Sequence, residues 1–158
     1  MDKPMPILTP PRRQHGFTLI EVLITVVVLA IGLLGLAGLQ LNGLRFTHSA
    51  YQTSQATIAA YDIIDRMRVN RLAAESGSYD IALGATPTAA NCSGTGVNCS
   101  PATLASADLT EWKQSIAALL PSGDGAVQRN GSAFLVTIRW DDSRGENDPK
   151  ELTVETVL

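Results

Sequence analysis

Three residues near the N-terminus have types and a spacing that could do chemistry together: Gly16, Phe17 and Glu21. Cleavage after Gly16 would create an α-amino group on Phe17, one helical turn before the Glu21 carboxylate. A glycine suits such a bond because it has no side chain to clash with a narrow protease subsite. The new amine could pair with Glu21 of its own or a neighbouring chain. The alternative is that Glu21 lies near a membrane interface and its carboxylate reaches water.

A partner for Glu21 matters because this residue stands at the start of an apolar segment. Positions 22–44 contain no charged residue, and about 20 apolar residues suffice for a helix to cross the hydrocarbon core of a bilayer. A carboxylate in hydrocarbon is costly unless it is paired. Because Lys3, Arg12 and Arg13 precede the segment, we expect the N-terminus to stay on the cytoplasmic side.

The residues after the apolar segment distinguish an anchor from a secretory signal. From position 42 to Leu72 the chain has no proline and only Gly43 as a helix breaker, so we predict that the helix continues. A cleaved signal peptide would end at a small-residue site followed by a break. The triplets Ala30-Ile31-Gly32 and Leu36-Ala37-Gly38 are alternative cleavage sites of that kind, but no break follows them.

The composition of the whole chain limits its class. Of the 158 residues, 45% are apolar and 17% charged, which is a low charged share for a soluble protein. The formal net charge is −3, so little basic surface is left to neutralise phosphates. We therefore expect no nucleic acid among the partners.

The N-terminal motif resembles a known processing site. Arg12-Arg13-Gln14-His15-Gly16 followed by Phe17-Thr18-Leu19-Ile20-Glu21-Val22-Leu23 resembles the prepilin leader of type IV pilins and type II secretion pseudopilins. The resemblance implies that residues 1–16 are a leader, that a prepilin peptidase cleaves after Gly16, and that Phe17 is then N-methylated. It also implies that Glu21 helps the subunit to dock into a growing filament.

Later segments resemble minor pilins of the PilV type. These segments are Tyr61-Asp62-Ile63-Ile64-Asp65-Arg66-Met67-Arg68-Val69-Asn70-Arg71, the pair Cys92 and Cys99, Ala107-Asp108-Leu109-Thr110-Glu111-Trp112, and Leu120-Pro121-Ser122-Gly123. The resemblance implies a minor pilin that promotes pilus assembly and supports adhesion or twitching motility. A minor pseudopilin of a type II secretion system, or an uncut membrane-anchored periplasmic binding domain, are the alternatives.

Partners and location follow from the same resemblance. The implied partners are the prepilin peptidase, other minor and major pilins that contact the N-terminal helix, and a tip adhesin. The chain would first be held in the inner membrane by a single span, with its C-terminal domain in the periplasm. It would then enter the pilus at or near the tip.

The predicted fold class is α+β and pilin-like: a long N-terminal helix packed against a small antiparallel sheet, with a short second helix and a disulfide loop. The long helix would run from Phe17 to about Leu72, with a membrane or filament-core half (17–44) and an amphipathic half (45–72). The globular region would cover 73–158. In the amphipathic half, Ile58, Tyr61, Ile64 and Met67 can share one face, while Gln52, Gln55, Asp62, Arg66 and Arg68 can face out.

Two groups on the long helix have alternative roles that the sequence leaves open. Gly32, Gly35 and Gly38 permit either close helix packing or local unwinding. The basic side chains of Arg66, Arg68 and Arg71 either form a solvated helix end, which we favour, or contact a neighbouring subunit.

The globular region should contain a loop and a second helix. Residues 76–101 are rich in small and polar residues and predict a loop, with a short strand at Tyr79–Leu83. The only two cysteines, Cys92 and Cys99, lie in a domain outside the cytoplasm, so we expect a disulfide. The second helix is predicted from Pro101 to Leu120; its apolar side would consist of Leu104, Leu109, Trp112, Ile116, Leu119 and Leu120.

A β-hairpin and a final strand complete the predicted fold. Residues 126–140 predict the hairpin around Asn130-Gly131. A polar loop and a last strand at Glu151–Leu158 follow. The side chains expected to face the long helix are Phe134, Val136, Ile138 and Trp140, and those expected on one side of the last strand are Leu152, Val154 and Leu158.

The sequence offers no candidate for catalysis, and we expect no enzyme, no cofactor and no metal. His48 is the only histidine after position 16, and a lone histidine on a helix is more often a surface residue than a base. The loop with Asp141, Asp142, Glu146 and Asp148 could hold calcium, but it lacks the pattern of an EF-hand. We therefore favour a solvated loop there.

Overall fold

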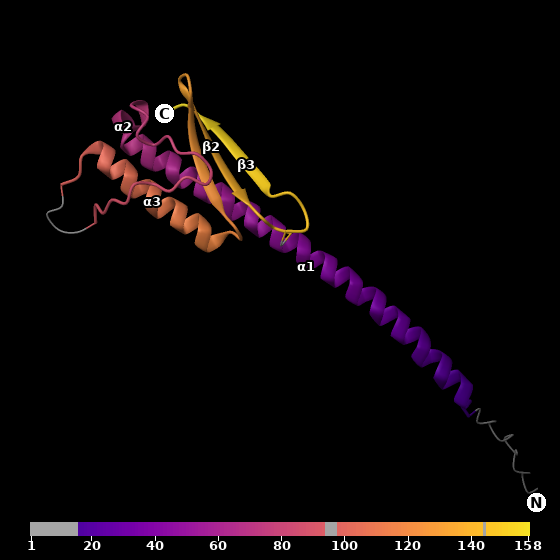
Figure 1. Cartoon of the computed structure of the whole chain (residues 1–158). Coiled ribbons are helices and arrows are strands. Elements are labelled where there is room, and N and C mark those ends of the chain that lie inside the picture. The colour runs from indigo at the N-terminus through magenta and orange to yellow at the C-terminus, as the bar shows by residue number, and fades with distance from the viewer. Residues whose placement is uncertain (1–15, 94–97, 144) are drawn as a thin grey trace, which may run out of the picture. The chain divides into compact units, whose positions relative to one another are not determined.

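The computed structural model describes residues 16–93, 98–143 and 145–158. These residues form α1 (Leu19–Val69), α2 (Arg71–Glu75), α3 (Pro101–Leu119), β1 (Asp124–Asn130), β2 (Ala133–Trp140) and β3 (Lys150–Thr156); Figure 1 labels all of them except β1. The chain divides into two compact units, the first ending at Leu44 and the second running from Arg45 to Leu158. Apart from Gly16, the predicted leader lies outside the described residues.

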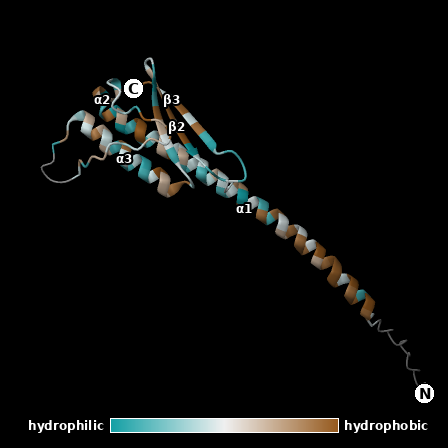
Figure 2. Cartoon of the chain, in the orientation of Figure 1, coloured by the Kyte–Doolittle hydropathy of each residue, from teal (hydrophilic) through white to brown (hydrophobic). Residues whose placement is uncertain are grey.

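The first unit contains the apolar part of α1. Every side chain described in this unit is exposed, and Figure 2 shows a nearly unbroken run of hydrophobic residues along the helix. Within the described part of the chain, α1 is the one helix long and apolar enough to cross a membrane. The helix begins at Leu19, two residues later than the predicted start at Phe17.

Helix α1 ends earlier than predicted because of Asn70. Its backbone N–H still bonds to the carbonyl of Arg66. Its carbonyl accepts from the amides of Ala73 and Ala74, and these bonds form the first turn of α2. The Asn70 side-chain amide donates to the carbonyl oxygen of Pro101 at 2.8 Å and to the Tyr79 hydroxyl at 3.3 Å. These distant partners interrupt the helix, so the predicted single element up to Leu72 is two helices.

The second unit has one hydrophobic core in which α1, α3 and the sheet meet. In Figure 1 the sheet and α3 both run alongside the second half of α1. The contribution of α1 to this core combines three alanines with larger side chains; its buried residues are Gln52, Ala56, Ala59, Ala60, Ile63, Ile64 and Met67. The predicted packing of a long helix against a small antiparallel sheet is thus confirmed.

The predicted buried face of α1 is partly wrong. Ile64 and Met67 are buried, but the side chains of Ile58 and Tyr61 are 61% and 53% exposed. Gln52, predicted to face out, is buried. The face that packs is the one with alanines, because their small side chains let α3 and the sheet approach the helix backbone closely.

Trp112 on α3 shows how close this approach is. Its indole is fully buried, and its Nε1–H donates to the main-chain carbonyl oxygen of Ala59 at 2.8 Å. A buried indole N–H needs such an acceptor. Trp112 therefore joins α3 to the alanine face of α1, and its predicted place in the core is confirmed.

Helix α3 follows the sequence prediction closely. Ser100 caps its N-terminus, with the hydroxyl accepting from the Thr103 amide at 3.2 Å, and Pro101 occupies the first turn. Leu109, Ile116 and the following Leu120 are buried. Leu119 was predicted to lie on the apolar side but is 53% exposed. The core is contacted at this end by Ile116 and Leu120, and Leu119 lies beside them on the helix surface.

The sheet has the strand order β1-β2-β3, and both pairs are antiparallel. Asn130 pairs with Ala133, so the hairpin loop is Gly131-Ser132, one residue later than predicted. The φ of +62° at Gly131 explains the shift, since the first position of such a tight loop favours glycine. Alternate β2 residues Phe134 to Trp140 are buried as expected.

The prediction of a strand at Tyr79–Leu83 is wrong except at one residue. Only Ile81 pairs with β1, through reciprocal hydrogen bonds of 2.9 Å with Val127. The residues that follow are held instead by Lys113, which pairs with Asp124 at 2.9 Å and donates to the carbonyls of Ala82 and Ala85. Side-chain contacts thus replace the strand ladder here.

The disulfide prediction is confirmed. Cys92 and Cys99 are joined, with their Cα atoms 6.0 Å apart. In the chain-entropy description, closing so short a loop stabilises the fold by roughly 2.5 kcal/mol. The bond constrains the chain just before Ser100 caps α3.

Gly125 in β1 gives a test of the close packing of Trp112 against the sheet. A Cβ atom added there would lie 2.4 Å from Cη2 of Trp112 and 2.9 Å from Cδ1 of Ile116. We expect Gly125→Ala to lower the free energy of unfolding by about 1–3 kcal/mol, because the core must shift to make room. Urea unfolding in detergent, followed by tryptophan fluorescence, measures this value.

The matched control is Gly43→Ala, which adds the same methyl group where nothing lies within 4 Å. This variant should be neutral or slightly stabilising, since alanine is the better helix former. Equal effects of the two substitutions would contradict the tight packing of Trp112 against β1.

Candidate functional site

The predicted cleavage point lies just before α1. Gly16 and Phe17 are not helical, and the Phe17 side chain is 85% exposed. A Cβ atom built on Gly16 would meet nothing within 4 Å. The bond between these residues is therefore accessible, in backbone that a protease could bind in an extended form.

Thr18 fixes the start of α1. Its hydroxyl accepts from the Glu21 amide at 3.3 Å, and its carbonyl accepts from the amides of Glu21 and Val22. A threonine followed three residues later by a glutamate is the sequence signature of a capping box. This role of Thr18 was not predicted, although the signature is present in the sequence.

Glu21 lies in the first turn of α1 and is exposed. The positive end of the helix dipole favours a carboxylate at this position. No described residue forms a hydrogen bond or ion pair with its carboxylate, and the hydroxyls of the neighbouring Thr18 and Thr25 bond to the helix backbone instead. The carboxylate is thus available to a partner outside the described part of the chain.

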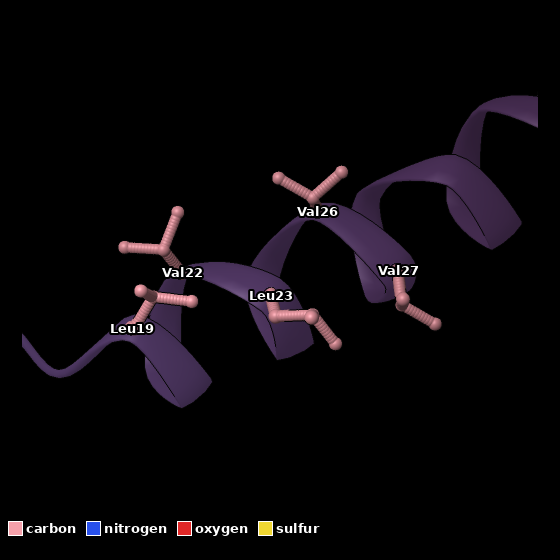
Figure 3. A pocket seen from close by; sticks show the side chains of 5 residues that line it. All are labelled: Leu19, Val22, Leu23, Val26 and Val27. Atoms are coloured by element: carbon pink, nitrogen blue, oxygen red, sulfur yellow. The ribbon is translucent and has the colours of Figure 1, made fainter.

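An apolar strip lies next to this site. Leu19, Val22, Leu23, Val26 and Val27 line an open patch, and Figure 3 shows them along the helix at the spacing of neighbouring turns. At about 100° per residue, Glu21 lies roughly opposite this strip. The first turns of α1 can therefore offer apolar packing on one side and a carboxylate on the other.

A second polar cluster surrounds Arg66 in the second unit. Its guanidinium contacts Asp62 at 3.0 Å, Asp108 at 3.2 Å and Glu111 at 2.8 Å. The Tyr79 hydroxyl donates to the other oxygen of Asp108 at 2.5 Å. The cluster joins the end of α1 to α3 and to the segment after α2.

The favoured prediction of a solvated helix end is wrong for Arg66. Its side chain is only 27% exposed and bonds within its own chain. Arg68 and Arg71 do lie on the surface, where they pair with Asp65 and Glu75. Asp62 lies one helical turn before Arg66, so this pair forms within α1, whereas Asp108 and Glu111 are brought to Arg66 by the packing of α3.

The charges in this cluster stabilise each other. Burial by itself lowers the pKa of Arg66, but its bonds to Glu111, Asp62 and Asp108 outweigh this effect and raise it. Burial and the hydrogen bond to Asp108 raise the pKa of Tyr79. Arg66 therefore stays charged and Tyr79 stays a donor, as a structural role requires.

The described residues contain no group of three or more His, Cys, Asp or Glu that could hold a metal ion. In the acidic loop, Asp142 pairs with Lys150 and accepts from the Ser49 hydroxyl at 3.0 Å. The hydrogen bond from Lys150 lowers the pKa of Asp142. This loop is tied to α1 by side chains, and His48 lies exposed on the same helix.

The arrangement of these elements defines a class of protein. A long helix, apolar and exposed in its first part, packs in its second part against a three-stranded antiparallel sheet. With the short helix α3 and the Cys92–Cys99 disulfide, this is a pilin-like fold.

Comparison with known families agrees with this fold. Residues 11–37 match the family described as the prokaryotic N-terminal methylation motif. Residues 38–110 match the family described as type IV pilin Tt1218. No curated protein and no solved structure is significantly similar to the chain.

The match to a methylation motif, followed by the match to a type IV pilin domain, supports a pilin subunit. The motif implies processing by a prepilin peptidase and assembly with other pilins. The pilin family points to a structural rather than an enzymatic protein. The apolar helix of such a protein supports membrane anchoring and a location in a pilus.

The structural role of Arg66 can be measured. Arg66→Gln would leave the mostly buried carboxylate of Asp108, whose side chain is 14% exposed, without its cation. We expect the free energy of unfolding to fall by about 1–3 kcal/mol. Urea unfolding followed by fluorescence of the buried Trp112 and Trp140 reports on this part of the chain.

Arg68→Gln is the matched control because Arg68 pairs with Asp65 at the surface. Its effect should stay within about 0.5 kcal/mol. If the two substitutions cost the same, Arg66 is no more than another surface arginine.

Proposed function

We propose that this chain is a minor pilin of the PilV type, a structural subunit that promotes assembly of a type IV pilus. The single observation that carries its assignment as a pilin subunit is the arrangement at the start of α1. An accessible Gly16–Phe17 bond precedes a helix capped by Thr18, and the unpaired carboxylate of Glu21 lies in its first turn.

Processing is the first step of the proposed function. The prepilin peptidase cleaves after Gly16 and methylates the new α-amino group of Phe17. The cut removes the basic leader, including Arg12 and Arg13, which holds the N-terminus on the cytoplasmic side of the inner membrane. The mature chain then begins two residues before the first residue of α1.

Docking is the second step. The α-amino group of Phe17 in one subunit pairs with the Glu21 carboxylate of its neighbour, in surroundings of low dielectric where an ion pair is strong. The exposed apolar side chains from Leu19 onward then exchange lipid contacts for contacts with the helices of other subunits. Such packing needs small residues, which Gly32, Gly35 and Gly38 supply.

The proposed minor role rests on the likeness of the later segments to PilV. We place the subunit with other minor pilins and a tip adhesin at or near the pilus tip, where it supports adhesion or twitching motility. The alternative within the same fold is a minor pseudopilin of a type II secretion system, which needs the same cleavage and docking. Loss of pili in a deletion strain with normal protein secretion separates the two.

The N-terminus of the mature protein tests the processing step. We expect mass spectrometry of the membrane or pilus fraction to find a chain that begins with Phe17 and carries one N-terminal methyl group. Gly16→Glu should block the cut, because the side chain fills the subsite before the bond. An intact leader on the wild-type protein would favour the uncut, membrane-anchored binding domain.

Glu21 tests the docking step. We expect Glu21→Ala and Glu21→Gln to be cleaved and inserted in the membrane but to be at least about tenfold depleted from sheared pili. A tenfold change corresponds to about 1.4 kcal/mol, and the loss of one ion pair in a low dielectric costs more than this. Immunoblots of the membrane and pilus fractions give the ratio. Glu75→Ala removes a carboxylate whose partner is the exposed Arg71 and should be incorporated normally.

The glutamine variant separates charge from shape. If Glu21→Gln enters pili as well as the wild type does, the charge is not needed, and the proposed pairing with the amine of Phe17 does not exist.

A further inference from the structure

The outer edge of β3 (Lys150–Thr156) has no partner in the described part of the chain. The strand order β1-β2-β3 leaves this edge open, while the opposite edge of the sheet is partly closed by the bridge between Ile81 and Val127. An open edge presents unpaired N–H and C=O groups to any strand that can reach it.

The hydrogen-bond pattern shows which groups these are. Val127 in β1 bonds through both its N–H and its C=O to Ile81, so neither points toward its β2 partner Val136. In an antiparallel pair, the backbone N–H and C=O of Val136 must then point toward β3, where Val136 pairs with Val154. The direction of the backbone N–H and C=O groups alternates along a strand. Those of Val154 point to β2, so those of Glu151, Thr153 and Glu155 point to the open edge.

The side chains of β3 limit what can bind there. Glu151, Thr153 and Glu155 are exposed on the outer face, while Leu152 and Val154 turn inward and are only partly covered. Arg139 is the β2 partner of Glu151, but Glu155 lies opposite Leu135, with no cation at its register position. The edge is therefore acidic on one face and apolar on the other.

We propose that the β3 edge binds an extended strand of another protein subunit in which basic and apolar residues alternate. Basic side chains would face Glu151 and Glu155, and apolar side chains would complete the cover of Leu152 and Val154. Pairing with a second copy of this chain is disfavoured in the register that pairs the most edge residues, because antiparallel pairing of two β3 strands about Thr153 sets Glu151 against Glu155 of the other copy. This surface is separate from the α1 surfaces used in the proposed docking.

A fused donor strand tests the edge in the full mature chain, held in detergent. The strand Lys-Val-Thr-Val-Lys is attached after Leu158 by a short Gly-Ser linker, which gives a high effective concentration. We expect the amides of Glu151, Thr153 and Glu155 to exchange with deuterium at least about tenfold more slowly than in the unfused chain. The matched control strand Glu-Val-Thr-Val-Glu should give little protection, since like charges then face each other.

Thr153→Pro supplies the internal control. Proline removes the N–H that points to the open edge and leaves the ladder to β2 intact, which edge strands tolerate. It should abolish protection by the basic strand, whereas Thr153→Val should keep it. Equal protection by both donor strands, absence of protection, or protection of these amides in the unfused chain by self-association would each overturn the proposal.

The same variants test the edge in cells. Thr153→Pro should reach the membrane at the wild-type level but be depleted from sheared pili, while Thr153→Val should be retained. Normal recovery of Thr153→Pro in pili would overturn a role for the edge in assembly. The donor-strand result does not depend on pili, so failure of the proposed pilin function would leave it unchanged.

Discussion

The close contact between Trp112 and the alanine face of α1 is the constraint on which the second unit depends. The fully buried indole reaches the helix backbone and donates to the main-chain carbonyl of Ala59. On its other side it leaves no room for any side chain at Gly125 of β1. One buried residue thus sets the distances from α3 to the long helix and to the sheet, and the tolerance is small because protein cores are close-packed.

Helix α1 meets two physical demands along its length. In the first unit its surface is apolar on all sides, which suits hydrocarbon or the interior of a helix assembly. In the second unit one face is buried against the protein's own core and the other is left exposed. Polar groups mark its ends: Thr18 caps the first turn, Glu21 stands unpaired beside it, and Asn70 ends the helix through bonds to distant parts of the chain. Glu21 has no partner among the described residues, and a carboxylate in an apolar environment is costly unless it is paired, so the proposed docking would supply the partner that it lacks.

Most local features could be predicted from the sequence, since neighbouring residues decide them. The apolar helix, the start of the second helix at Pro101, the glycine-containing hairpin and the pairing of the only two cysteines all follow from short-range chemistry. The error in the buried face of α1 has a physical cause. Ile58 and Tyr61 were assigned to the core because large apolar side chains are the usual buried ones, yet the buried face includes the three alanines Ala56, Ala59 and Ala60 and leaves Ile58 and Tyr61 exposed.

The sequence alone determined the fold class, the apolar segment and the motif from Gly16 to Glu21, because each depends on residues a turn or less apart or on composition. Only the tertiary structure decided what Arg66 and Lys113 do. Their partners, Asp108, Glu111 and Asp124, lie more than a helix turn away in sequence and arrive when α3 packs on α1 and β1. The open, acidic edge of β3 is likewise a property of strand order and register, which follow from how the whole sheet closes over α1.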